Sequence, residues 1–210
     1  VKGAPNTFIV GDMPFLSYEV SAEKAVENAG RMMKEAGVDC VKLEGGVEVA
    51  DTVAAIVKAG IPVMGHIGLT PQSSSQLGGF RVQGKDLTAA EKLLEDALAL
   101  EEAGSFCIVL EAIPNPVAQV ITEKLTVPSL GIGAGPHCDA QVLVMHDLLG
   151  LFDRFVPKFV KQYAQLGKDV VAAFSKFDEE VKAGTFPDDE HSYHVSEAVE
   201  REILEHLRKL

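Results

Sequence analysis

The chain has 210 residues, of which 47% are hydrophobic and 24% are charged, so it is long enough to form one sizeable core. Its net charge of −12 and pI of about 4.9 argue against a surface that binds nucleic acid or anionic membranes, because both need concentrated Lys and Arg. We find no apolar run that could cross a membrane and no signal peptide, which predicts a cytoplasmic protein. Three cysteines without metal-ligand spacing predict reduced thiols.

Short apolar runs alternate with helical patterns along most of the chain. Ser21 is a candidate N-cap for the first helix, and Gly37 and Gly104 are placed to end the first and third helices. The segment 139–152 is ambiguous between strand and helix. The expected strands are 7–12, 39–45, 61–67, 106–113 and 127–135, and the expected helices are 21–37, 47–60, 86–104, 115–125, 158–183 and 195–210.

This alternation predicts an α/β fold. Near-continuous apolar strands separated by helices are typical of a parallel sheet covered by helices on both faces. Five strands are clear and 139–152 offers a sixth, whereas a closed (β/α)8 TIM barrel needs eight. The pattern alone therefore leaves a barrel and an open doubly wound sheet as alternatives. We expect a single domain over residues 1–210, with a helical C-terminal part at 157–210.

One long loop interrupts the alternation. Residues 68–85 read GLTPQSSSQLGGFRVQGK, and they are rich in Gly, Ser and Gln. Long loops within compact domains are usually lids, binding loops or disordered segments. Because this loop follows an expected strand, we interpret it as a lid or substrate loop.

Charged side chains stand at the ends of the expected strands, where α/β barrels carry their chemistry. Lys42 and Glu44 are two residues apart on one strand, so both point to the same face; they either pair with each other or reach a polar pocket, and we favour the pocket. Asp12 is either a turn cap or a metal ligand. Glu44 at the equivalent end of the next strand favours the ligand, and hard oxygen donors of this kind suit Mg²⁺.

Two further candidates lie on neighbouring strands. Glu111 ends the most apolar strand, and an apolar setting makes a carboxylate a competent proton acceptor near neutrality. We therefore interpret Glu111 as a general base; the alternative is a carboxylate held by backbone amides of the next turn. His66 is either a donor that faces the substrate or a satisfied core histidine. The GIGAG run at 131–135 is only a weak nucleotide-binding signal.

Several segments, in order and spacing, resemble one known family, ketopantoate hydroxymethyltransferase (3-methyl-2-oxobutanoate hydroxymethyltransferase). The similarity runs from residue 1 to about residue 194, and its most specific part is GHIGLTPQ followed by GGFRVQG. The segments that carry it are GAPNTFIVGDMPF, VKLEGG, PVMGHIGLTPQS, GGFRVQG, VLEAIP, GIGAG, QVLVMHD, PKFVK and DDEHSYH.

The resemblance implies a (β/α)8 barrel enzyme of coenzyme A biosynthesis. Such enzymes transfer a hydroxymethyl group from 5,10-methylenetetrahydrofolate to 3-methyl-2-oxobutanoate, through a Mg²⁺-stabilised enolate, and they form homo-oligomers, often decamers. The resemblance makes Asp12 a ligand of Mg²⁺ in contact with the substrate, and it places Glu44 in the metal shell. Lys42 and His66 would bind the keto acid, and Glu111 would be the catalytic base.

The sequence departs from the family at its start. Family members carry two earlier βα units, including a GDS segment with a second Asp ligand and a Ser that contacts substrate, and nothing here matches it. The sequence also begins with Val1 and not with Met, so we expect that one or two βα units of the barrel precede it. Two alternatives stay open: a truncated, inactive barrel, and a related C–C lyase or mutase that acts on another 2-oxo acid.

Overall fold

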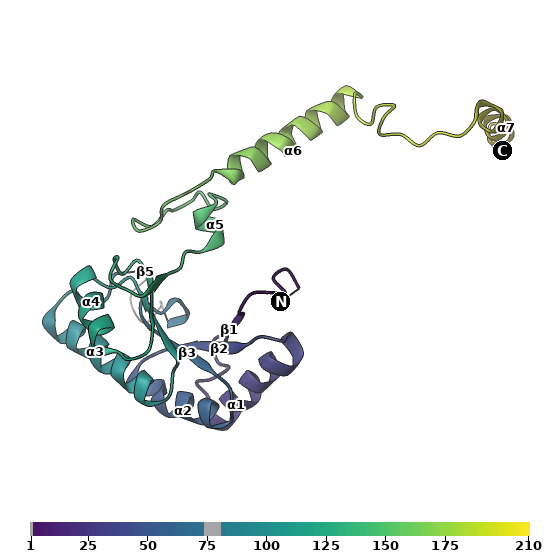
Figure 1. Ribbon diagram of the computed structural model, residues 1–210. Coiled ribbons are helices and arrows are strands. Elements are labelled where there is room, and N and C mark those ends of the chain that lie inside the picture. The colour runs from purple at the N-terminus through teal and green to yellow at the C-terminus, as the bar shows by residue number, and fades with distance from the viewer. Residues whose placement is uncertain (1, 74–80) are drawn as a thin grey trace. The chain divides into compact units, whose positions relative to one another are not determined.

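The computed structural model describes residues 2–73 and 81–210 (Figure 1). It divides into two compact units. The first contains Val1–Val144 and Pro157–Val160, and the second contains Met145–Val156 and Lys161–Leu210. The single domain that we expected over 1–210 stays a prediction.

The first unit is built on a six-stranded sheet in which every neighbouring pair is parallel and the strands follow one another in sequence order. A doubly wound sheet would reverse direction from an inner strand, so the sequential order favours part of a barrel. Among the described residues the sheet is open, with the first and last strands at its edges. The strands are β1 (Val10–Asp12), β2 (Cys40–Glu44), β3 (Val63–Gly68), β4 (Cys107–Glu111), β5 (Ser129–Ile132) and β6 (Ala140–Gln141).

The helices of the first unit begin and end close to where the sequence predicts. The Ser21 hydroxyl accepts a hydrogen bond from the Lys24 amide at the start of α1, and Gly37 ends the following π-helical turn with φ 69°. The segment 139–152 resolves into β6 and a short helix, α5. The helical elements are α1 (Ala22–Arg31), η1 (Met32–Ala36), η2 (Val47–Val49), α2 (Ala50–Lys58), η3 (Pro71–Ser73), α3 (Leu87–Glu102), α4 (Asn115–Lys124), α5 (Met145–Leu148), α6 (Leu166–Ala183) and α7 (Glu197–Leu207).

The two faces of the sheet differ in what covers them. The buried apolar residues of α1–α4 join one core cluster with one face of the sheet, including Leu43 and Leu110. These four helices lie along one side of the sheet (Figure 1). Because side chains alternate along a strand, Lys42, Glu44, His66 and Glu111 point to the other face. The prediction that helices cover both faces is therefore wrong for α1–α4, which pack as the outer helices of a barrel do.

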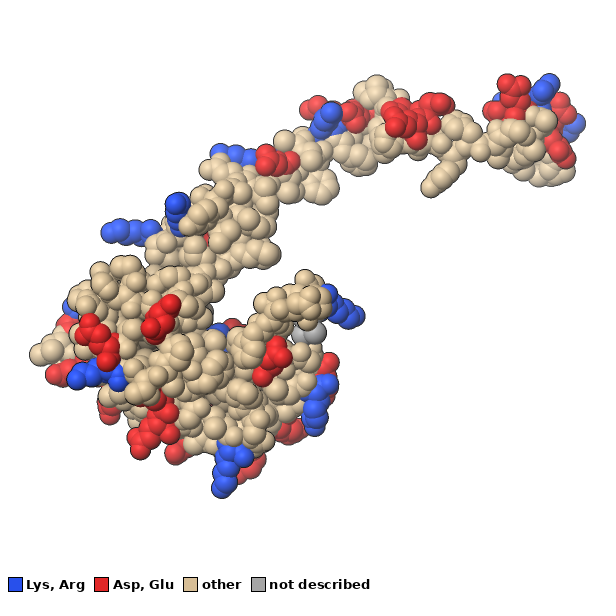
Figure 2. Space-filling model, viewed as in Figure 1, with Lys and Arg blue, Asp and Glu red and all other residues tan. Residues whose placement is uncertain are grey.

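The second unit consists largely of helices with exposed side chains. We expected helix from residue 158, but α6 begins at Leu166, because Pro157–Val160 form a turn and Gln165 has a non-helical backbone. Neither α6 nor α7 contains a buried residue. Of the helices that the structure describes, none has the length and apolar character needed to span a membrane. On the face visible in Figure 2, Lys and Arg are scattered and form no broad basic patch.

The thiol of Cys40 gives a pH-dependent prediction. Cys40 is fully buried on β2, and burial raises the pKa of its thiol from 9.0 to about 11. Between these values the unfolded chain loses this proton first, so the free energy of unfolding should fall as the pH rises from 9 to 11. We expect wild type to lose about 1–2 kcal/mol more than Cys40→Ala in urea titrations across this window. Equal losses in both proteins would contradict the shift.

Candidate functional site

The five predicted residues lie at the C-terminal ends of four neighbouring strands. Asp12 ends β1 opposite Lys42 of β2, Glu44 ends β2 opposite His66 of β3, and Glu111 ends β4. Parallel strands bring these ends to one edge of the sheet. The sequence-based expectation that the charged ends lie together is confirmed by this register.

Short distances connect the five side chains, with His66 next to Lys42, Glu44 and Glu111. The Lys42 Nζ atom lies 2.8 Å from Asp12 Oδ1 and 3.2 Å from His66 Nδ1. The other ring nitrogen, His66 Nε2, lies 3.2 Å from Glu111 Oε2, while Nδ1 is 3.8 Å from Glu44 Oε1. The alternative in which Lys42 simply pairs with Glu44 is therefore wrong, since the ammonium group pairs with Asp12.

Burial differs sharply between the two carboxylates that we predict to hold a metal. The Asp12 side chain is 56% exposed, whereas that of Glu44 is 3% exposed. Burial raises the pKa of Glu44, and the charges of His66 and Lys42 and the Gln72 amide oppose this effect. The negative charge of Asp12 adds to the upward shift of the Glu44 pKa.

His66 is not a satisfied core histidine. Its side chain is 4% exposed, yet among the described residues Nε2 has no hydrogen-bond partner, because the approach to Glu111 has the distance but not the direction of a hydrogen bond. A buried nitrogen without a partner is costly, and a bound ligand, ion or water can supply the missing partner. The geometry thus favours the substrate-facing alternative for His66.

The backbone around Glu111 is tightly held while its carboxylate is not. The Glu111 carbonyl accepts from the Leu69 amide at 2.8 Å, and the Ala112 amide donates to the Ile132 carbonyl at 2.8 Å. Ala112 has φ 49°, a left-handed conformation that is strained for a residue with a side chain. In the part of the chain that the structure describes, no backbone amide donates to the Glu111 carboxylate, so the capping alternative lacks support.

The donor set is compatible with Mg²⁺. Among the described residues no three His, Cys, Asp or Glu side chains are grouped as a complete metal site. Mg²⁺ commonly uses only one or two protein carboxylates and takes its other ligands from water and substrate. Asp12 and Glu44 supply two hard oxygen donors at adjacent strand ends, so the residues present fit a site of this open kind.

Two residues near Glu44 escaped the sequence analysis. The Gln72 amide donates to Glu44 Oε2 at 3.0 Å, and the Tyr18 hydroxyl accepts from the Glu44 amide at 3.3 Å. Gln72 lies in the GLTPQ run, which begins at the last residue of β3. Its place directly after the strand that carries His66 was the only hint in the sequence that it belongs to the site. Nothing in the pattern around Tyr18 pointed to a role.

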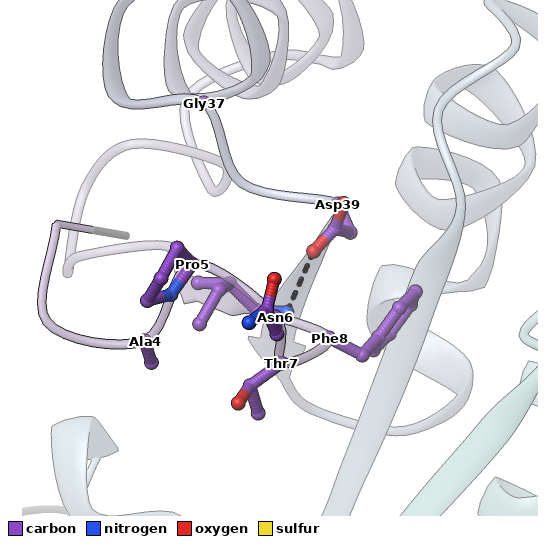
Figure 3. Close-up of a pocket in the computed structure, with 8 residues that line it drawn as sticks. Ala4, Pro5, Asn6, Thr7, Phe8, Gly37 and Asp39 are labelled. Atoms are coloured by element: carbon purple, nitrogen blue, oxygen red, sulfur yellow. Dashed lines mark hydrogen bonds between the residues drawn. The ribbon is translucent and has the colours of Figure 1, made fainter.

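The predicted lid can be followed only in part. Its residues 74–80 lie outside the described residues, so the lid stays a prediction. A separate cavity of about 360 Å³ lies at the other end of β1, lined by residues 4–9 with Gly37 and Asp39 (Figure 3). There the Asp39 carboxylate accepts from the Ile9 amide at 2.7 Å. None of the five predicted site residues lines this cavity.

The sequence comparisons with known proteins agree on one family. A family model described as ketopantoate hydroxymethyltransferase matches residues 1–189. A 3-methyl-2-oxobutanoate hydroxymethyltransferase of Heliobacterium modesticaldum is 62% identical over 193 residues, which cover 92% of this chain and 70% of that protein. One of the same name from Syntrophobacter fumaroxidans is 60% identical over 196 residues, covering 93% and 70%.

The similarity to solved structures is weaker. A putative phosphonomutase from Burkholderia cenocepacia superposes with a TM-score of 0.48 at 16% identity, over 66% of this chain and 64% of that one. A putative lyase/mutase from the same organism has a TM-score of 0.43 at 14% identity, over 91% and 68%.

Proposed function

The chain belongs to the ketopantoate hydroxymethyltransferase family, and we propose that the side chains at the ends of β1–β4 carry out its reaction. The enzyme transfers a hydroxymethyl group to 3-methyl-2-oxobutanoate, and we infer 5,10-methylenetetrahydrofolate as the donor. The observation that carries the proposed site is the row of contacts from Asp12 through Lys42 and His66 to Glu111. The alternatives of a related lyase or mutase and of an inactive barrel are not favoured by these matches.

Glu111 is the proposed base. Its carboxylate is 15% exposed, and among the described residues no backbone amide donates to it, while Oε2 lies 3.2 Å from His66 Nε2. We infer that this carboxylate takes the proton from C3 of the keto acid. Proton removal leaves negative charge on the keto oxygen. The unpartnered His66 Nε2 is placed to donate to an oxygen there, provided that this nitrogen carries the proton.

Lys42 supplies the positive charge of the site. Its ammonium group is held between Asp12 and His66, and its side chain is 16% exposed. A cation at low exposure stabilises a carboxylate or enolate more strongly than one in bulk water does. We infer that the substrate carboxylate binds Lys42. It would compete with the Asp12 carboxylate for the Lys42 ammonium group.

Asp12 and Glu44 would hold Mg²⁺. When bound, the ion would act as a Lewis acid towards the keto and carboxylate oxygens of the substrate. Over the whole transfer, the methylene carbon loses its two bonds to folate nitrogens and gains one bond to C3 of the keto acid and one to an oxygen that comes from water. The proton from C3 and one proton of the water end on the two folate nitrogens, and tetrahydrofolate leaves.

The wider assembly is also a proposal. Six parallel strands in sequential order support a (β/α)8 barrel, which needs two further strands between β6 and β1 to close. The homo-oligomer, with a decamer as the arrangement that the family implies, and the cytoplasmic location remain predictions.

Proton NMR of 3-methyl-2-oxobutanoate in D₂O tests this function. We expect the C3 proton signal to disappear with the protein and Mg²⁺, and to persist after chelation of the metal. Adding 5,10-methylenetetrahydrofolate should convert the keto acid to 2-dehydropantoate. A folded protein that leaves the signal unchanged at every Mg²⁺ concentration would contradict the proposal.

A further inference from the structure

Gln72 makes three hydrogen bonds that tie two strand ends together. Its backbone amide donates to Glu44 Oε2 at 3.0 Å. Its side-chain amide donates to the Met13 carbonyl at 2.9 Å, and its side-chain oxygen accepts from the Tyr18 hydroxyl at 3.4 Å. Since Met13 directly follows Asp12, one residue connects the ends of β1 and β2 where both predicted metal ligands lie.

Tyr18 fixes the orientation of this connection. Its side chain is buried, with 3% of the residue exposed, and its hydroxyl accepts from the Glu44 amide at 3.3 Å while donating to Gln72. A phenol has one proton, and because the Tyr18 oxygen accepts from the Glu44 amide, that proton is free to be donated to Gln72. This donation selects the rotamer of the Gln72 amide in which the nitrogen faces Met13.

Among the described residues, one oxygen of the Glu44 carboxylate accepts a hydrogen bond and the other accepts none. Oε2 accepts from the Gln72 amide at 3.0 Å, whereas Oε1 lies 3.8 Å from His66 Nδ1, beyond hydrogen-bond distance. A buried carboxylate can turn about its side-chain bonds unless its oxygens are bound, and a turned carboxylate would present the wrong oxygen to a cation. Partners of metal ligands are known to be worth roughly 10–100-fold in metal affinity.

We propose that Gln72, oriented by Tyr18, is a positioning residue that sets the direction of the Glu44 carboxylate and its separation from Asp12, and thereby the affinity for Mg²⁺. The metal part of this inference depends on the proposed function. The clamp itself, defined as Tyr18, Gln72 and their bonds to Met13 and Glu44, depends only on the contacts above.

Gln72→Ala tests the clamp because it keeps the backbone amide and removes both side-chain bonds. Gln119→Ala is the control, since the Gln119 side-chain amide also donates a hydrogen bond, to the Glu123 carboxylate, and both residues lie on α4. By calorimetric titration without substrate, we expect Gln72→Ala to bind Mg²⁺ about tenfold more weakly and Gln119→Ala to bind it as wild type does. Wild-type affinity in a folded Gln72→Ala protein would overturn the proposal.

A metal-free measurement separates the clamp from the metal site. Tyr18→Phe removes only the hydroxyl, and we expect amide hydrogen exchange at Glu44 and Gln72 to become about tenfold faster, with exchange along α4 unchanged. A double variant should lose no more Mg²⁺ affinity than Gln72→Ala alone, because both changes break one unit. If wild type binds no Mg²⁺, the metal part of the proposed function fails. Unchanged exchange at both amides would overturn the clamp.

Discussion

Replacing Glu111 with Gln should lower the rate of C3 proton exchange in 3-methyl-2-oxobutanoate by about a thousandfold, because the amide cannot accept the proton. Gln keeps the size of the side chain and one of its two acceptor oxygens. We therefore expect the keto acid to bind within about threefold of its wild-type affinity, so that the loss lies in the chemical step. Proton NMR in D₂O with saturating substrate and Mg²⁺ measures the exchange rate.

The control for this prediction is Glu123→Gln. Glu123 is an exposed residue of α4 that accepts a hydrogen bond from Gln119, so the same chemical change is made away from the strand ends. Exchange at the wild-type rate is expected for this variant. Wild-type exchange in Glu111→Gln as well would show that another group removes the proton.

Gly68→Ala should destabilise the protein by about 4 kcal/mol, because two penalties coincide at this position. Gly68 has φ 95°, where a side chain is strained, and an added Cβ would overlap with the Glu111 carbonyl oxygen and press against Ile113. The carbonyl cannot move freely, since it accepts from the Leu69 amide. Urea denaturation of the two proteins measures the difference.

Gly60→Ala separates the two penalties. Gly60 has φ 86°, close to that of Gly68, but nothing lies within 4 Å of its added Cβ. Only the backbone strain should remain there, costing about 1 kcal/mol. The larger loss at Gly68 then measures how closely β3 approaches Glu111. Similar losses in both variants would mean that the Glu111 backbone gives way easily.

The sequence predicted the strands and the strand-end residues because both depend on local pattern. Glu44 and Glu111 follow apolar runs, and parallel packing then brings such ends together without further information. Which of these charged side chains pair with each other could not be predicted in the same way. Lys42 pairs with Asp12 because β1 and β2 register those two residues opposite each other, and this register is a property of the pair of strands.

The supporting contacts were missed for a related reason. Gln72 is 28 residues from Glu44 and 59 from Met13 along the chain, and its role depends on where a loop folds back over two strands. No spacing rule connects such positions. The start of α6 was misplaced because helical periodicity continues through 158–165, where a turn and an irregular backbone break the helix.

Because side chains alternate along β2, each residue's position in the strand decides whether it faces the core or the site. Val41 and Leu43 belong to the core beneath the helices, and Lys42 and Glu44, one step away, belong to the chemistry. Inserting or deleting a single residue in this strand would move the charges into the core and the apolar side chains into the site. A length change in β2 should therefore be far less tolerable to evolution than almost any substitution, whereas the turns that join strands to helices can vary in length.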